Sequence, residues 1–266
     1  AFERTESGDT IYVMPGTYSG DFNTGIYTSH DLTVIGTGSV DETVFELTND
    51  IFISFGSGSN GTVQNITFTG STPGSASVQI SFHNNAHHVL TLYLRLFLHL
   101  HRNSVRVSEY NTANISNCVF AGNTSNPNNS PYGSSVWIDN YTEVNISGCL
   151  FYDNQDVDNN SNHYGTIYAN STDYTLNMDN CTFSDNGGEG SVAIYDYHTN
   201  TPKYINITNS IFYSDIIDAP HTNLNVSYSL IYDVDGTGNF YNDPLFCDTD
   251  SSDFTLHDNS PCVGSF

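Results

Sequence analysis

A short motif returns about every 30 residues along this chain, and it constrains the fold more than any other feature. Self-similarity at a fixed period is typical of repeat architectures, in which each unit buries its apolar face against the next. Four close copies and two looser ones occur: Asn117-Cys118-Val119-Phe120, Gly148-Cys149-Leu150-Phe151, Asn180-Cys181-Thr182-Phe183, Asn209-Ser210-Ile211-Phe212, and the looser Asn65-Ile66-Thr67-Phe68 and Tyr228-Ser229-Leu230-Ile231.

Between the copies lie short runs of β-branched and aromatic residues, such as 32–35 and 63–68, separated by clusters of Gly, Asn, Asp and Ser. This pattern indicates strands and turns with almost no helical period. Strands at a constant repeat, with no helices between them, wind into a coil in which neighbours lie about 4.8 Å apart. We therefore predict an all-β chain, a single right-handed parallel β-helix of roughly nine turns over residues 1–266.

Equivalent positions in successive repeats are expected to stack as columns along such a coil. Each close copy of the motif ends in Phe, and these residues are predicted to form one buried column: Phe120, Phe151, Phe183 and Phe212. Cys is among the most buried residue types, so Cys118, Cys149 and Cys181 are expected to form a second internal column. Asn117, Asn180 and Asn209 are expected at the turns, where Asn side chains can stack as hydrogen-bonded ladders.

The segment 82–107 departs from the repeat, because its turn residues almost vanish and Leu alternates strictly with other residues from Leu90 to Leu100. Strict alternation predicts a long strand with one Leu face. That face is too apolar to remain in water, so it belongs to the core or to an interface. Two interpretations stay open: a real extended strand or hairpin that contacts a partner, or a misread stretch whose composition is foreign to its flanks.

Charge and composition narrow the function classes. The formal net charge is −24, with 29 acidic and only five basic side chains, and binding nucleic acid needs clustered Lys and Arg. No stretch approaches the roughly 20 apolar residues of a membrane-spanning helix. No signal peptide is present, so we expect a mature or trimmed form of a secreted, extracellular or cell-surface protein.

Two cysteines stand apart from the repeat and bracket the final segment. A disulfide between Cys247 and Cys262 would close a short loop and staple the last turn. We predict this bond, which implies an oxidising, extracellular setting.

The chain resembles the secreted right-handed parallel β-helix repeat proteins, whose distant relatives include pectate lyases. Three signatures carry the resemblance, which covers nearly the whole chain: Gly8-Asp9-Thr10-Ile11-Tyr12-Val13-Met14-Pro15-Gly16-Thr17-Tyr18, the Asn-Cys-x-Phe repeats, and Asn242-Asp243-Pro244-Leu245-Phe246 followed by Asp253-Phe254-Thr255-Leu256 and Ser260-Pro261-Cys262. The resemblance is specific for the fold and weak for activity, because that group contains enzymes, adhesins and surface proteins alike.

The resemblance also implies what a catalytic site would need. Lyases of this fold use Arg or Lys as a base beside acid-bound calcium, and the candidates are Arg4, Arg95, Arg102, Arg106 and Lys203, none with an evident carboxylate cluster one repeat away. Glycosidases need paired acids across the bond. The recurring acids Asp153, Asp185 and Asp215 follow the Phe positions and are interpreted as solvated turn residues, so no catalytic residue is assigned.

Two other kinds of site are predicted. Asp153, Asp156 and Asp158 crowd one loop and could bind Ca²⁺ through hard oxygen ligands, although the spacing completes no EF-hand loop; no other cofactor is expected. Twelve Asn-x-Ser/Thr sequons occur, of which Asn128 and Asn180 are weak. The predicted glycan acceptors are Asn60, Asn65, Asn114, Asn123, Asn140, Asn145, Asn159, Asn170, Asn206 and Asn225.

We favour a non-catalytic extracellular structural or adhesive surface protein, a glycosylated fibre subunit that assembles end to end with itself. Only residues 1–7 precede the first predicted strand and four residues follow Cys262, so neither end is expected to carry a cap, unless the chain is a piece of a longer protein. Open strand edges invite pairing. The alternatives are a polysaccharide-active β-helix enzyme, lyase or glycosidase, and a carbohydrate-binding module.

Overall fold

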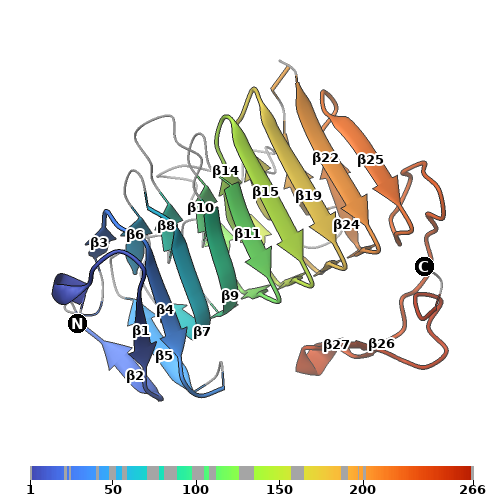
Figure 1. Cartoon of the computed structure of the whole chain (residues 1–266). Helices are drawn as coiled ribbons and strands as arrows, with labels where there is room; N and C mark the ends of the chain where they lie inside the picture. The colour runs from blue at the N-terminus through green and yellow to red at the C-terminus, as the bar shows by residue number, and fades with distance from the viewer. Residues whose placement is uncertain are drawn as a thin grey trace.

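The protein is an all-β parallel solenoid, a β-helix with almost no helix, in this computed structural model (Figure 1). Among the described residues its helices are the short 3-10 turns η1 (Phe2–Arg4) and η3 (Thr249–Ser251). The structure describes residues 2–20, 23, 25–39, 42–47, 52–55, 59–70, 78–80, 89–97, 105–107, 112–125, 135–156, 165–186, 191–196, 198–199 and 202–264.

Three faces wind around the axis, and each is a ladder of parallel strands. Face A follows the order β1 (Asp9–Val13), β4 (Leu32–Gly36), β7 (Gly61–Gly70), β9 (Val89–Phe97), β11 (Thr112–Ser116), β15 (Thr142–Ser147), β19 (Tyr174–Asp179), β22 (Lys203–Thr208) and β25 (Asn223–Ser227). Face B contains β2 (Gly16–Ser19), β5 (Thr43–Leu47), the second halves of β7 and β9, β12 (Val119–Ala121), β16 (Leu150–Tyr152), β20 (Thr182–Ser184) and β23 (Ile211–Tyr213).

Face C is a separate sheet with the order β3 (Ile26–Thr28), β6 (Ile53–Phe55), β8 (Val78–Ile80), β10 (Val105–Val107), β14 (Val136–Ile138), β18 (Ile167–Ala169), β21 (Ser191–Tyr195) and β24 (Asp215–Asp218). A small parallel pair, β13 (Thr124–Ser125) with β17 (Gln155–Asp156), extends the corner after face B. The one antiparallel pair described joins β26 (Phe246–Asp248) to β27 (Asp253–Leu256).

The motif residue before Cys or Ser makes the corner between faces A and B. Asn117, Asn180 and Asn209 have φ of 52°, 52° and 51°, and Gly148 takes the same left-handed conformation at φ 59°. Asn and Gly are the residues that adopt this conformation most readily. The expected ladder of these Asn side chains is wrong, because Gly148 interrupts it and Asn209 donates to Asp179 Oδ1 instead, at 2.8 Å.

The predicted Phe column is confirmed. Phe120, Phe151, Phe183 and Phe212 are fully buried, and their rings stack in sequence with centroids 4.7, 4.4 and 4.7 Å apart and planes within 6° of parallel. The column forms because each Phe pairs in register with the next across face B. The repeat in the sequence therefore corresponds to a continuous aromatic core.

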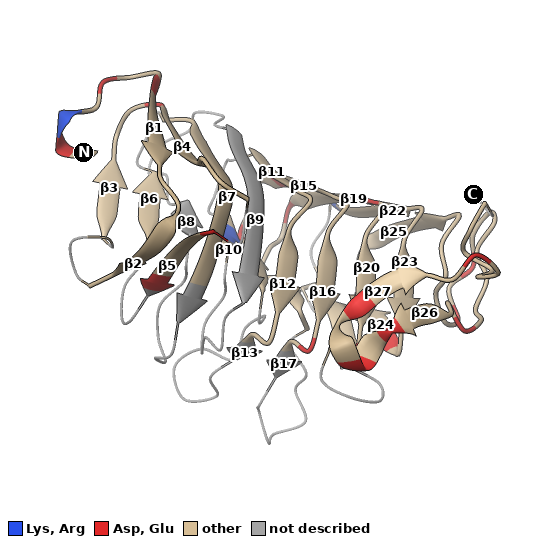
Figure 2. Ribbon diagram, turned by 90° about the horizontal axis from the view of Figure 1, so that it is seen from below, with Lys and Arg blue, Asp and Glu red and all other residues tan. Residues whose placement is uncertain are grey.

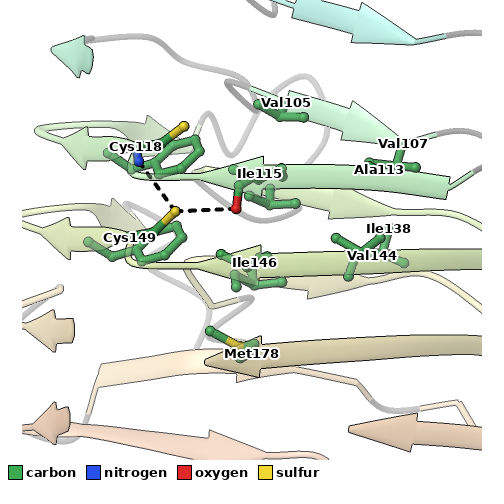
Figure 3. Close-up of a cluster of buried hydrophobic side chains, with 14 of the residues drawn as sticks. Val105, Val107, Ala113, Ile115, Cys118, Ile138, Val144, Ile146, Cys149 and Met178 are labelled. Atoms are coloured by element: carbon green, nitrogen blue, oxygen red, sulfur yellow. Dashed lines mark hydrogen bonds between the residues drawn. The ribbon is translucent and has the colours of Figure 1, made fainter. Parts of the chain in front are cut away.

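The Cys column is also buried. The backbone N–H of Cys118 donates to Cys149 Sγ at 3.4 Å, and that thiol donates to the carbonyl of Ile115 at 3.6 Å (Figure 3). Ser210 and Ser229 continue the column, with the N–H of Cys181 donating to Ser210 Oγ at 3.1 Å. Small side chains are suited to this position because each one accepts a hydrogen bond from the turn before it.

The strict repeat is shorter than the roughly nine turns expected. Four successive turns, from β11 to β24, each contain one strand on every face and the complete motif. Before them, β7 and β9 each contribute to both faces A and B as one strand, and Asn65 within β7 takes the left-handed conformation of the corner, at φ 52°.

Within the atypical segment 82–107, the structure describes 89–97 and 105–107. The first is β9, which pairs in parallel with β7, β11 and β12, and the second is β10. Leu90 and Leu92 are in register with Ala113 and Ile115, both buried. The backbone of this segment therefore continues the coil.

The C-terminal segment with β26 and β27 folds back against face B, as Figure 2 shows from below. Phe254 packs on Tyr152 with ring centroids 4.8 Å apart, and Phe246 packs edge-on against both Phe254 and Tyr213. Cys262 is buried with Ile211 and Leu230 in a small second core.

Candidate functional site

The polar residues of most chemical interest lie at the corner that follows face C. One residue per turn occupies this corner: Asp139 after β14, Asn170 after β18 and Asp196 after β21. Each backbone N–H there donates to the carbonyl of a neighbouring turn, at 3.0, 2.9 and 2.9 Å in that order. The coil thus fixes a column of two carboxylates with an amide between them, which we call the corner column.

Asp139 anchors the end of the corner column nearest the N-terminus. Its Oδ2 accepts from Arg106 Nε and Nη2 at 3.1 and 3.0 Å, and its Oδ1 accepts from Trp137 Nε1 at 2.8 Å. The Arg106 guanidinium also lies over the Trp137 ring, 4.8 Å from its centroid. Such cation–π contacts contribute about 0.5–2 kcal/mol. Arg106 is therefore held in place by its neighbours, on the outer surface of β10 and β14.

Asp196 forms the buried end of the corner column. Lys203 Nζ lies 2.6 Å from Asp196 Oδ2, and both side chains are completely buried. The same oxygen accepts from Thr222 Oγ1 at 2.6 Å and from Tyr174 Oη at 3.1 Å, and Oδ1 accepts from the N–H of His198 at 3.0 Å. Burial, together with the charge of Asp196, raises the pKa of Tyr174, so its hydroxyl stays protonated.

Asn170 connects the two ends. Its Oδ1 lies 3.1 Å from His198 Nε2 and 3.5 Å from Tyr168 Oη. The rings of Trp137 and Tyr168 meet edge to face at 5.6 Å, and those of Tyr168 and Tyr195 lie nearly parallel at 5.9 Å. The aromatic rings thus pack on one another along face C.

Two of the candidate bases, Arg106 and Lys203, pair with carboxylates of the corner column. The sequence did not predict either partner. An accessible base with free acids is what lyase or glycosidase chemistry requires. Lys203 and Asp196 are sealed from solvent, and Arg106 already pairs with Asp139. These contacts hold the corners together. Arg4 is exposed in η1, the side chain of Arg95 is not described, and Arg102 lies outside the described residues.

The signal that sequence reasoning missed is an offset. Asp139, Asn170 and Asp196 each directly follow a strand of face C: β14, β18 and β21. Aligning the chain on these three strands predicts the corner column.

Asp215, one of the three recurring acids, was wrongly predicted to lie at the same turn position as Asp153 and Asp185. Asp153 and Asp185 are indeed turn residues, with φ of 51° and 56°, but the equivalent residue in the next turn is Ser214, at φ 66°. Asp215 is buried and accepts from Asn186 Nδ2 at 2.9 Å. It ends a buried amide ladder in which Asn123 donates to Asn154 at 2.6 Å and Asn154 to Asn186 at 2.7 Å.

The predicted calcium loop is only partly described. Asp153 lies at its turn after β16, the side chain of Asp156 is not described, and Asp158 lies outside the described residues. Over the described ranges, no group of three or more His, Cys, Asp or Glu side chains is arranged to hold a metal ion.

The predicted glycan acceptors lie in three kinds of place. Four of them form an outward amide ladder on face A with Asn177, in the order Asn114, Asn145, Asn177, Asn206 and Asn225, with amide contacts of 3.1, 2.8, 2.8 and 3.0 Å. Asn60, Asn65, Asn140 and Asn170 lie at turns and corners, exposed or half-buried. The prediction for Asn123 is wrong, because its amide is fully buried in the ladder with Asn154; Asn159 lies outside the described residues.

The predicted Cys247–Cys262 disulfide is absent, and both thiols are free. Cys247 is exposed on β26, whereas Cys262 points into the small core with Ile211 and Leu230. The C-terminal segment is held by packing and by hydrogen bonds such as Ser260 Oγ to the carbonyl of Pro244, at 2.5 Å.

Comparison with known protein-family models finds no match, and none of the curated proteins matches the chain. Among the described residues there is no helix with the length and apolar character needed to cross a membrane.

Proposed function

We propose that this chain is a non-catalytic structural or adhesive protein of an extracellular surface, which associates end to end with copies of itself. The observation that carries the proposal is the outward amide ladder of face A, in which each Asn amide bonds the next along the axis. Polar groups that satisfy one another along the coil stiffen it and leave few groups for chemistry.

End-to-end association is supported by the open edge of β1. Among the described strands, β1 pairs only with β4, so it has one edge without a strand partner, whereas the outer side of β25 is covered by the segment that follows it, in which Asn239 Nδ2 donates to the carbonyl of Val226 at 3.1 Å. Such an open edge is a template for pairing with another chain. A head-to-tail contact that does not close generates a filament. Glycans on the exposed sequons, such as Asn60 and Asn65, fit an extracellular location.

A proline in β1 tests this association. The N–H of Thr37 donates to the carbonyl of Val13 at 2.9 Å, so alternation along the strand directs Ile11 and Val13 toward β4 and the N–H of Tyr12 to the open edge. Tyr12→Pro should abolish concentration-dependent growth in light scattering, because Pro removes that donor. Tyr12→Ala is the matched control, since it loses the same exposed side chain and keeps the N–H. Equal growth of both variants would contradict pairing through β1.

A carbohydrate-binding module is the second candidate, favoured by two tyrosines near the C-terminal end. Tyr232 and Tyr241 are 60% and 46% exposed, and their rings meet edge to face at 5.2 Å. Exposed aromatic side chains suit contact with the apolar face of a neutral sugar. Pull-down on insoluble cellulose and chitin, with Tyr232→Ala as the comparison, tests this function.

A further inference from the structure

The buried pair of Lys203 and Asp196 has a geometry that goes beyond an ordinary ion pair. The amine lies 2.6 Å from Asp196 Oδ2, and neither side chain has any solvent exposure. The Lys203 amine also donates to the carbonyl of His198, in the loop between the two residues. These contacts hold the amine beside the carboxyl group, with few alternative positions for either side chain.

Three protein donors are directed at the same carboxylate. Tyr174 Oη and Thr222 Oγ1 donate to Oδ2 at 3.1 and 2.6 Å, and the N–H of His198 donates to Oδ1 at 3.0 Å. Donors placed around a carboxyl group in a water-excluded site stabilise the charge that develops on its oxygens when a nucleophile attacks. Reacting groups that are held in contact also avoid most of the entropy cost of meeting.

Condensation of the pair starts with a proton transfer between its two members. Removing an ammonium and a carboxylate from water costs several kcal/mol per ion even after relaxation, and their attraction offsets this only in part. Transfer of one proton from Lys203 to Asp196 gives a neutral amine and a neutral acid, and a neutral amine is a nucleophile.

We propose that Lys203 and Asp196 are joined by an isopeptide bond that forms in the folded protein. The bond from Lys203 Nζ to Asp196 Cγ forms and the bond from Cγ to Oδ2 breaks. Oδ2 leaves as water with two of the three ammonium protons, and the third stays on the amide nitrogen. No oxidant, reductant or cofactor takes part, and the product carries no charge.

Tyr174 is the residue that assists this step. Its hydroxyl donates to the departing Oδ2, and burial keeps that hydroxyl protonated by raising its pKa, so it is available as a donor throughout the neutral range. The product is a covalent clip between the end of β21 and the start of β22, which joins the third and fourth turns of the strict repeat. It fixes the corner that follows face C, where β19, β21 and β22 contribute the residues around Asp196.

Mass spectrometry of the full chain, produced without glycosylation and fully denatured, tests the proposal. The expected mass is lower than that of the sequence by one water molecule, and Lys203→Met should restore the full mass. Trypsin should not cleave after Lys203, and fragmentation should identify a branched peptide that joins it to Asp196. A wild-type chain with its full mass and normal cleavage after Lys203 would overturn the proposal.

Two further variants separate this bond from other losses of water. A succinimide at Asp235-Gly236 also removes one water, but it persists in Lys203→Met and is opened by hydroxylamine, whereas an isopeptide bond resists that treatment. Asp196→Asn should lose ammonia in place of water if the same attack occurs. Tyr174→Phe should slow the appearance of the cross-link, and an unchanged rate would remove Tyr174 from the reaction.

Discussion

Removing one ring from the Phe column is the sharpest perturbation of the repeat. Phe151 is fully buried, with ring neighbours on both sides, Phe120 at 4.7 Å and Phe183 at 4.4 Å. Truncating a buried Phe to Ala costs about 3–5 kcal/mol of unfolding free energy, which includes the cavity left behind. Each lost ring contact contributes about 0.5–1.5 kcal/mol beyond burial, so we expect Phe151→Ala near the upper end of that range.

Urea unfolding followed by the fluorescence of Trp137, the one Trp of the chain, measures this loss. Phe212→Ala is a graded comparison, because Phe212 stacks on the column through Phe183 and ends it. Its loss of unfolding free energy should be smaller than that of Phe151→Ala by the contribution of one ring contact, about 0.5–1.5 kcal/mol. Tyr204→Ala, at an exposed position on face A, should stay within about 0.5 kcal/mol of wild type. A Phe151→Ala loss no larger than that of Tyr204→Ala would refute a continuous buried column.

The other predictions concern the buried polar groups and thiols. Compared with wild-type chain in which Lys203 is not cross-linked, Asp196→Ala should lower the free energy of unfolding in urea by about 3–5 kcal/mol, because it leaves the Lys203 amine buried without its partner. A loss below about 1 kcal/mol would show that water reaches the site. Asn154→Ala should cost about 1–3 kcal/mol for each amide partner left unsatisfied, and an Asn154→Ser variant should recover part of it. Native thiol titration should find Cys247 reactive and Cys149 unreactive, since burial raises the pKa of Cys149 above its ordinary value of 9.0. The sign follows: this thiol stabilises the fold fully below pH 9.0, and the contribution is lost as the pH rises toward the folded pKa. A flat stability profile above pH 9.0 would contradict it.

The sequence was sufficient to predict the columns that repeat with identical residue types. Phe120 and Phe151 share spacing, neighbours and side chain, so the register across face B follows directly from the motif. The amide ladders were harder to predict, because Asn is frequent at every kind of turn in this chain. Asn117 and Asn114 are three residues apart, yet only the second belongs to a ladder, since it lies on a strand and faces outward.

The corner contacts could not be predicted from the repeat, because they join residues of different type. Lys203 meets Asp196 across a corner that no motif marks, and Tyr174 reaches the same carboxylate from β19, where it is in register with Lys203. The disulfide prediction failed for a related reason. Spacing in the chain brings Cys247 and Cys262 near one another, but whether two side chains face each other depends on packing, and Cys262 faces the core.

Electron microscopy of the purified full chain over a range of concentrations is the direct test of end-to-end assembly, because it separates single coils from polymers. We expect rods of constant width that lengthen as the concentration rises, and that stay short in Tyr12→Pro. Uniform single particles at the highest concentration, from the wild-type chain, would contradict end-to-end assembly as its function.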